Sequence, residues 1–411
     1  MSQNTRRIGI ERIGVYPTGL SLSMDALCAA RGADREYVRE AYLVDERAVN
    51  APWEDPVTMA VNAAHPMLTA EDRGQIGLLI VASESAVDQE KPLSTWVHRY
   101  LDLPTRCRNF EVKHACYGAT AALQMAVAWL ASGMAGGQKA LIINTDHAMS
   151  SIGQPWEFVM GAGAAAVLVS EQPALLEIEP GRSGIYAREV SDVMRPTLLV
   201  ETGNSEASLH SYFDALYGCW EDYAARTGAD FVQEFARNIY HVPLGGMAWR
   251  AHRALLGLTT EMSKAEARAD FEARVLPSLR HNRRMGGTYG ASTFIALLGL
   301  IEGCPELLPE DRIGIFAFGA GSCAELWSGR LGRDAHAVAA KARLGERLDA
   351  RLALTVAEYE QVEHVRESAI GARDWTAPTE GLRGCYDRDY RGQNRLVLRG
   401  IRDWVREYAW S

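Results

Sequence analysis

The sequence predicts an α/β protein whose sheets are buried between helices. Two observations predict this class: short, almost wholly apolar runs alternate with helical runs, and one helix–strand unit recurs later in the chain. Near-continuous apolar strands are typical of sheets that helices cover on both faces. The length of 411 residues suits two domains or one large α/β unit.

The first part of the chain supplies five predicted elements. Residues 8–15 and 75–83 are predicted strands, the second because its apolar run ends in small polar residues. Residues 120–132 are apolar on nearly all faces and predict a buried helix. Residues 139–145 predict another buried strand, and residues 164–170, which follow a glycine turn, predict a hairpin partner.

The later part of the chain is more polar. Residues 180–280 are predicted to be mainly helical, with a helix over 263–279 that has a serine at its start. Residues 332–378 are charged and poor in apolar side chains, which favours a pair of surface helices. Residues 396–410 close the chain as an amphipathic, aromatic segment.

A four-residue motif recurs 172 positions along the chain. Tyr-Gly-Ala-Thr at 117–120 becomes Tyr-Gly-Ala-Ser at 289–292, and each copy opens an apolar helix. By the same offset, residues 140–146 correspond without a gap to residues 312–318. This agreement favours a duplicated unit over chance similarity between two alanine-rich helices. The predicted divisions are an N-terminal half, a C-terminal half with a helical insertion, and an extension packed on the core: residues 1–175, 176–332 and 333–411.

Composition and charge argue against several classes of protein. Lys and Arg total 43 against 52 Asp and Glu, so the net charge of −9 disfavours a broad nucleic-acid surface. No apolar run approaches the ~20 residues of a membrane span. The N-terminus lacks the apolar core of a signal peptide, so a cytoplasmic location is expected. The seven cysteines are scattered and form no C-x-x-C, which argues against disulfides and a metal site.

Cys116 differs from the other cysteines in its placement. It follows a polar turn and immediately precedes the predicted buried helix. Free N–H groups and the helix dipole at such a point favour a thiolate and can hold an oxyanion. The position 172 residues later is Thr288, so only one half carries the thiol. Taken alone, the position of Cys116 would favour a small buried residue without a catalytic role.

Glu84 and His241 are two further residues whose placement allows two interpretations. Glu84 follows a predicted buried strand, where desolvation raises the pKa of a carboxyl group and makes it a usable base. The alternative is a solvated loop residue, because the following residues are polar. His241 stands beside a proline at a predicted break, where an imidazole is either structural or directed into a pocket.

Four short motifs occur in order along the chain. They are Ala-Ser-Glu-Ser at 82–85, Ala-Cys-Tyr at 115–117, Gly-Ala-Gly-Ala at 161–164 and His-Val-Pro at 241–243. In this order and spacing the sequence resembles the 3-hydroxy-3-methylglutaryl synthase family of the thiolase superfamily, over residues 8–330. The resemblance implies a five-layered αβαβα fold with two pseudo-equivalent halves, and a homodimer.

The resemblance also implies an aldol-type condensation between thioesters without an enzyme-bound cofactor. Cys116 would accept an acetyl group, Glu84 would remove a proton from its methyl, and His241 would donate a hydrogen bond to the carbonyl that is attacked. The oxyanion hole would combine the N–H of Cys116 with one from the turn at 319–322. Further pocket residues expected are Tyr117, Pro243, Gly287, Tyr289, Ser292, Gly319, Ala320, Gly321 and Ser322.

Three departures from the family pattern bear on the thioester carrier. Residues 244–253 contain no lysine, Gly287 replaces the family's asparagine, and Ala320 replaces its serine. These changes argue against ordinary coenzyme A recognition. Residues 114–118, with others after His241 and near the C-terminus, resemble the branch that adds β-branches in polyketide pathways.

That branch implies two carrier-protein partners that deliver phosphopantetheine thioesters: an acetyl donor acyl carrier protein and an acceptor carrier protein with a β-ketoacyl chain. Carrier proteins are acidic, so a basic docking surface is expected. The candidate arginines for this surface are Arg250, Arg253, Arg280, Arg283 and Arg284. The alternative is that they lie on a solvated helix face and dock nothing.

Three other activities are alternatives for this sequence. A primary-metabolism hydroxymethylglutaryl-CoA synthase, using acetyl-CoA and acetoacetyl-CoA, is the main alternative. A ketoacyl-carrier-protein synthase III-like enzyme would need an asparagine where Gly287 stands and would leave Glu84 without a role. A thiolase-fold protein that only decarboxylates or binds would be expected to lack Cys116 or Glu84.

Overall fold

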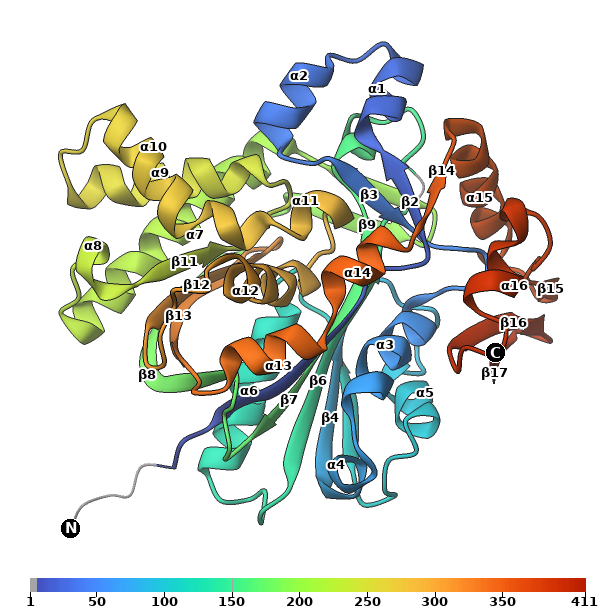
Figure 1. The fold of residues 1–411 in the computed structure, drawn as a ribbon, viewed down its shortest axis with the longest axis horizontal. Coiled ribbons are helices and arrows are strands. Elements are labelled where there is room, and N and C mark those ends of the chain that lie inside the picture. The colour runs from blue at the N-terminus through green and yellow to red at the C-terminus, as the bar shows by residue number, and fades with distance from the viewer. Residues whose placement is uncertain (1–5, 150) are drawn as a thin grey trace.

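A nine-stranded mixed sheet organises the computed structural model, which describes residues 6–149 and 151–411 (Figure 1). Helices cover both faces of this sheet, as the apolar strands predicted. Its strands, from one edge to the other, are β11 (Arg237–Tyr240), β12 (Arg312–Gly319), β13 (Cys323–Leu331), β8 (Leu176–Ala187), β1 (Gly9–Tyr16), β7 (Ala162–Ser170), β6 (Lys139–His147), β4 (Ile76–Ala82) and β5 (Arg108–Val112).

The sheet consists of two halves that meet at β1 and β8. Only two residue pairs join these strands, Gly9 with Glu177 and Ile10 with Leu176. In the first half β4 and β6 run parallel, and β7 and β1 continue antiparallel. In the second half β11 and β12 run parallel, and β13 and β8 continue antiparallel. The repeated order confirms the two pseudo-equivalent halves, with β5 as an addition to the first.

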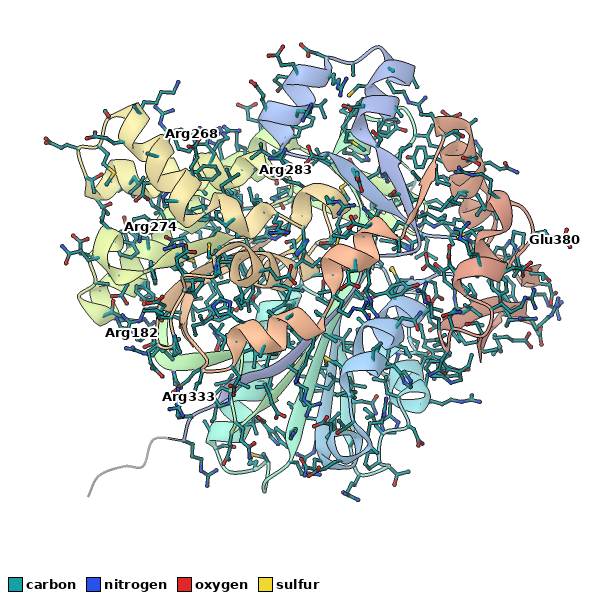
Figure 2. The ribbon with its side chains drawn as sticks, in the orientation of Figure 1. Arg182, Arg268, Arg274, Arg283, Arg333 and Glu380 are labelled. Carbon is teal, nitrogen blue, oxygen red and sulfur yellow. The ribbon has the colours of Figure 1, made fainter. Side chains whose placement is uncertain are left out.

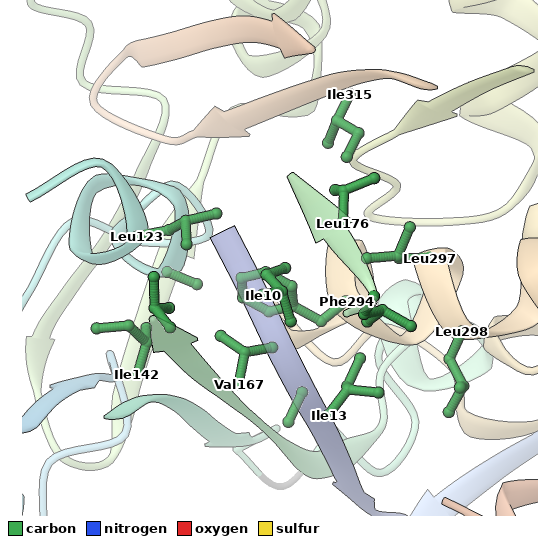
Figure 3. Packing of buried hydrophobic residues seen from close by; sticks show 14 of the residues in the cluster. Ile10, Ile13, Leu123, Ile142, Val167, Leu176, Phe294, Leu297, Leu298 and Ile315 are labelled. Atoms are coloured by element: carbon green, nitrogen blue, oxygen red, sulfur yellow. The ribbon is translucent and has the colours of Figure 1, made fainter. Parts of the chain in front are cut away.

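Two apolar helices form the central layer. They are α6 (Gly118–Ala131) and α12 (Ala291–Gly303), the helices that the repeated motif opens. Figure 3 shows Leu123 of α6 and Phe294 and Leu297 of α12 around Ile10 of β1 in one buried cluster. Burial of this much apolar surface is the main stabilising contribution to such a fold.

The strands alternate between this centre and the outer helices. On β4, Ile80 belongs to the central cluster, whereas Leu79 and Val81 pack in a second cluster with α3 (Pro56–Ala64) and α5 (Leu93–Tyr100). On β12, Ile315 faces the centre and Phe316 faces a third cluster. That cluster is formed with α7 (Ser205–Thr227), α9 (Gly246–Thr259) and α10 (Lys264–Arg274). The five expected αβαβα layers are therefore present.

The remaining strands and helices lie around this core. There are three small sheets in the described residues. The first contains β14 (Leu352–Leu354), β2 (Leu20–Ser23) and β3 (Glu46–Val49), and the second contains β9 (Val193–Thr197) and β10 (Val200–Gly203). The third contains β15 (Trp375–Thr376), β16 (Leu396–Arg402) and β17 (Val405–Trp410). The other helices are α1 (Met24–Arg31), α2 (Arg35–Tyr37), η1 (Val38–Tyr42), η2 (His65–Met67), α4 (Ala70–Gln75), η3 (Pro155–Phe158), α8 (Phe231–Glu234), η4 (Leu276–Leu279), α11 (Asn282–Met285), α13 (Ala335–Lys341), α14 (Leu344–Asp349), α15 (Val356–Ser368), η5 (Leu382–Gly384) and α16 (Cys385–Asp389).

Two expectations about local structure differ from what is observed. The helix expected over 263–279 begins after its Ser263 cap but ends at Arg274, because Pro277 cannot continue the α-helical hydrogen bonds and the chain turns into η4. Residues 332–378 contain three helices and the strands β14 and β15, rather than one helix pair. The closing segment folds as the hairpin β16–β17.

The predicted divisions at 175/176 and 332/333 remain predictions. Across the described residues, no helix has the length and hydropathy needed to span a bilayer.

Candidate active site

Two parallel strand ends place Glu84 beside Asp146. Because β4 and β6 are parallel neighbours, the residues after β4 and those ending β6 meet at one edge of the sheet. Asp146 Oδ1 accepts hydrogen bonds from the Glu84 N–H at 2.9 Å, Ser85 Oγ at 2.9 Å and Ser83 Oγ at 3.1 Å. Asp146 therefore holds the main chain on which the Glu84 side chain is mounted.

The Glu84 carboxyl group lies next to the Cys116 thiol. The Cys116 Sγ is 3.8 Å from Glu84 Oε1 and donates to it. Burial, followed by the charge of Asp146, raises the pKa of Glu84 to about 8. Burial also raises the pKa of Asp146 to about 6. The two carboxyl groups interact and titrate as a pair, with Glu84 as the more basic member.

The pKa of the Cys116 thiol is higher than the sequence suggested, so the thiol is a weaker acid. Burial, and then the charges of Glu84 and Asp146, raise the pKa of Cys116 well above its ordinary value. The expected thiolate at a helix N-terminus is therefore wrong for the resting protein. Helix α6 begins only at Gly118, and burial together with the two carboxyl groups outweighs the effect of its dipole on the pKa of Cys116.

His241 is mounted at the end of β11 in the second half. Its N–H donates to the Phe316 carbonyl at 2.7 Å, and Tyr212 Oη donates to its carbonyl at 3.0 Å. Its Nδ1 lies 3.1 Å from Ser292 Oγ. Burial lowers the pKa of His241 to about 4, so the imidazole is neutral near pH 7. A neutral imidazole can still donate one hydrogen bond to a substrate.

Close backbone packing joins the two halves around Cys116. A Cβ on Gly290, just before α12, would lie 2.8 Å from the Cys116 carbonyl oxygen. A Cβ on Gly319 would lie 2.8 Å from the His114 carbonyl oxygen. Only glycine fits such approaches, so both positions bring second-half elements against the cysteine segment.

The turn after β12 has two of its N–H groups already engaged. The Gly321 N–H donates to Asp192 Oδ1 at 2.9 Å, and the Ser322 N–H donates to the Arg188 carbonyl at 2.8 Å. Within the described residues, the N–H of Ala320 has no such partner. Ala320 therefore has the N–H of this turn that is most readily offered to a substrate.

The other expected pocket residues lie in several environments. Tyr117 Oη donates to Glu325 on β13 at 3.0 Å. Gly287 forms an isolated bridge with Met160, and its N–H donates to the Val159 carbonyl. The Tyr289 hydroxyl lies 3.4 Å from Arg195 Nη2. Ser292 contacts His241, as stated above, and Pro243 is exposed.

The five candidate docking arginines divide into two groups. Arg283 forms a two-pronged ion pair with Asp45, and Arg284 pairs with Glu46 and Asp349. Internal pairing reduces what these two can offer to a partner. The other three are exposed: Arg250, Arg253 and Arg280.

A hollow of about 1000 Å³ lies next to Trp249 of α9. Arg268 also packs over the Trp249 ring, at 5.4 Å, and Figure 2 places Arg268 and Arg283 toward the same end of the molecule. The hollow's charged lining is Arg35, Arg39, Arg268 and Arg283 with Asp34, Glu36 and Glu40. Arg35, Arg39 and Arg268 are not among the arginines singled out from the sequence, because only the fold brings the segment 35–39 beside α10.

Sequence reasoning also missed Asp146 and Arg195. Asp146 directly follows the predicted strand 139–145, as Glu84 directly follows 75–83, so two carboxyl groups at the ends of buried strands were an available signal. Arg195 lies in a polar stretch without a motif. In the described part of the chain, no group of three or more His, Cys, Asp or Glu side chains is arranged to hold a metal ion.

Comparisons with known proteins decide the family. The models "Hydroxymethylglutaryl-coenzyme A synthase N terminal" and "C terminal" match residues 54–174 and 257–383. The chain is 36% identical, over 98% of its length and 99% of the relative, to "Polyketide biosynthesis 3-hydroxy-3-methylglutaryl-ACP synthase PksG" of Bacillus subtilis. The chain belongs to the hydroxymethylglutaryl-coenzyme A synthase family. It is therefore an acyltransferase-type enzyme that forms a carbon–carbon bond.

Solved structures of this family agree with the fold. The curacin biosynthetic pathway HMG synthase, solved in complex with acetyl donor-ACP, matches with a TM-score of 0.94 and 36% identity over 98% of this chain and 100% of that one. MvaS in complex with 3-hydroxy-3-methylglutaryl coenzyme A matches with a TM-score of 0.88 and 32% identity over 98% and 99%. These matches confirm the thiolase-like fold and the polyketide branch of the resemblance.

Proposed function

We propose that this chain is the 3-hydroxy-3-methylglutaryl synthase of a polyketide β-branching pathway. It would join acetyl from an acyl carrier protein to the β-carbonyl of a β-ketoacyl chain on a second carrier protein. The contact between Cys116 Sγ and Glu84 Oε1 carries the chemistry of this proposal. The full-length similarity to PksG and to the curacin enzyme supports the carrier-protein substrates.

In the first step, the Cys116 sulfur attacks the acetyl thioester and forms acetyl-enzyme. The bond between acetyl and the pantetheine sulfur breaks, and the proton of the Cys116 thiol ends on that departing sulfur. The N–H groups of Cys116 and Ala320 hold the oxyanion of the tetrahedral intermediate.

In the second step, Glu84 removes a proton from the acetyl methyl, and the same N–H groups stabilise the enolate. The enolate carbon attacks the β-carbonyl of the acceptor. His241, neutral and buried, donates a hydrogen bond to the oxygen that gains charge. The protonated Glu84 returns its proton to that oxygen, and water then hydrolyses the thioester at Cys116.

No enzyme-bound cofactor is needed in this scheme, because phosphopantetheine arrives on the carrier proteins. We further propose a homodimer formed through the β5 edge of the sheet. Of the two edge strands, β11 and β5, the second carries Phe110, which is 42% exposed, and Met125 on the adjacent α6 is 58% exposed. The expected cytoplasmic location remains a prediction.

The first test is acetyl loading followed by intact-protein mass spectrometry. The enzyme is exposed briefly to acetyl carrier protein or, separately, to acetyl-CoA. Acetylation of Cys116 that is much faster from the carrier protein is expected. Fast loading from acetyl-CoA with little from the carrier protein would assign the chain to primary metabolism, and no loading from either would overturn the catalytic proposal.

The hollow beside Trp249 is the surface proposed to dock the acidic carrier protein, and charge reversal tests it. Of the arginines that line it, Arg39 is exposed, and within the described residues Arg268 forms its ion pair with exposed Glu272. The double variant Arg39→Glu/Arg268→Glu is expected to lower kcat/KM for loading from acetyl carrier protein by about tenfold or more, because it repels an acidic partner. Loading from a small acetyl-pantetheine thioester is expected to be unchanged.

Two comparison variants sharpen this test. Arg226→Glu, at an exposed position on α7, is the matched control and is expected to load normally. A loss confined to Arg250→Glu/Arg253→Glu would place the carrier protein on α9 instead of over the hollow. Equal loss from the small thioester would show that the substitutions disturb the fold rather than docking.

A further inference from the structure

A short hairpin bridges the two halves of the site. Strands β9 and β10 form this hairpin between β8 and α7. Its base is bound through Asp192, whose Oδ1 accepts from the Gly321 N–H and whose carbonyl accepts from the Asn204 N–H at 2.8 Å. The hairpin therefore has a fixed attachment to the turn that follows β12.

Arg195 is the hairpin side chain that reaches the site. Across residues 193–203, every residue is exposed except Arg195 and Glu201. Arg195 Nη1 donates to the main-chain carbonyl of Glu84 at 2.9 Å. Its Nη2 and Nε donate to Glu201 Oε2 at 2.6 and 3.1 Å, and Nη2 lies 3.4 Å from Tyr289 Oη. One guanidinium thus joins the hairpin to the residue that carries the proposed base.

We propose that Arg195 is a positioning residue for the condensation, acting by holding the Glu84 main chain through its carbonyl. The proposal rests on the function proposed above. Asp146 holds the Glu84 N–H and Arg195 holds the Glu84 carbonyl, so residue 84 is fixed from both sides. Such fixing preserves the short reach that proton abstraction requires.

The charges around Glu84 give Arg195 a second effect. Asp146 and Glu201 raise the pKa of Glu84, whereas Arg195 lowers it. Loss of the Arg195 charge therefore leaves the charges of Asp146 and Glu201 unopposed, which raises the pKa of Glu84 further. The ionisable groups that face Glu84 are Asp146, Arg195, Glu201, Cys116 and Tyr289.

The test separates enolisation from loading. Acetyl-enzyme is prepared from acetyl carrier protein and transferred to D₂O, and exchange of the acetyl methyl protons is followed by intact mass spectrometry from pH 6 to 9. For Arg195→Met we expect exchange to slow by about tenfold at neutral pH, and its pH midpoint to move upward. Loading, which does not use Glu84 as a base, is expected to change only a few-fold.

Conservative variants identify the cause. Arg195→Lys keeps the charge and is expected to restore the pH midpoint while recovering only part of the rate, because one ammonium cannot reproduce the forked contacts. Arg226→Met, an exposed arginine on α7, is expected to exchange as the wild type does.

Failure of this proposal differs from failure of the proposed function. If wild type exchanges, Glu84→Gln does not, and Arg195→Met keeps both the wild-type rate and pH midpoint, then Arg195 has no positioning role. A slowed rate with an unchanged midpoint in Arg195→Met, with Arg195→Lys equally slow, would also overturn the charge argument. If Glu84→Gln exchanges like the wild type, Glu84 is not the base and the proposed function falls.

Discussion

Cys116→Ser is expected to abolish acetyl loading, with a fall on the order of 10⁴-fold or more. A serine hydroxyl is far less acidic than a thiol, and the environment that already raises the pKa of Cys116 would disfavour an alkoxide still more. The measurement is intact mass after brief exposure to acetyl carrier protein, followed by peptide mapping of the acetylated site.

The matched control for this prediction is Cys107→Ser. Cys107 is a free, buried cysteine just before β5, and its Sγ donates to the Arg108 carbonyl rather than to a carboxyl group. This variant is expected to load at the wild-type rate. Loading retained by Cys116→Ser would remove Cys116 as the nucleophile.

Glu84→Gln is expected to load acetyl but to condense about 10²- to 10⁴-fold more slowly, because an amide cannot take the methyl proton. The neutral amide also no longer raises the pKa of Cys116, so the thiol remains usable for loading. Single-turnover assays with preformed acetyl-enzyme and a β-ketoacyl carrier protein measure the condensation without the loading step.

The pH dependence gives the same variant a second readout. The pKa of Glu84 is raised to about 8, so its base form is lost as the pH falls below that value. Wild-type condensation is therefore expected to rise with pH through a midpoint near pH 8 and to level off about one pH unit above it, whereas the residual rate of Glu84→Gln should lack this dependence. Glu90→Gln, exposed in the same loop, is the control. Full condensation by Glu84→Gln would remove Glu84 as the base.

Local pattern was enough to predict the main strands and helices. The strand expected over 75–83 is β4, and the helix expected over 120–132 is α6. Apolar periodicity reports burial directly, which is why these elements could be placed. The repeat at 289–292 likewise predicted α12 and the second half of the sheet. Where the pattern was polar, as over 332–378, the number of elements was not predicted.

The candidate site depends on contacts between distant segments. The motifs pointed to Cys116 and Glu84, and the structure places their side chains 3.8 Å apart. The sequence could not show that Asp146 holds residues 83–85, because that contact depends on β4 and β6 being neighbours. It also could not show which arginines are engaged in internal ion pairs, as Arg283 is with Asp45.

The sequence by itself determined the fold class, the duplication and the identity of the thiol, carboxyl and imidazole candidates. The fold class and the duplication follow from apolar patterning and spacing, and the three candidates follow from short motifs that resemble those of a known family; all of these are local properties of the chain. Only the tertiary structure decided the protonation of the site. Burial and the summed charges of Glu84 and Asp146 raise the pKa of Cys116, against the local effect of a helix N-terminus. Electrostatic effects of this kind depend on distances through space, which one-dimensional spacing does not contain.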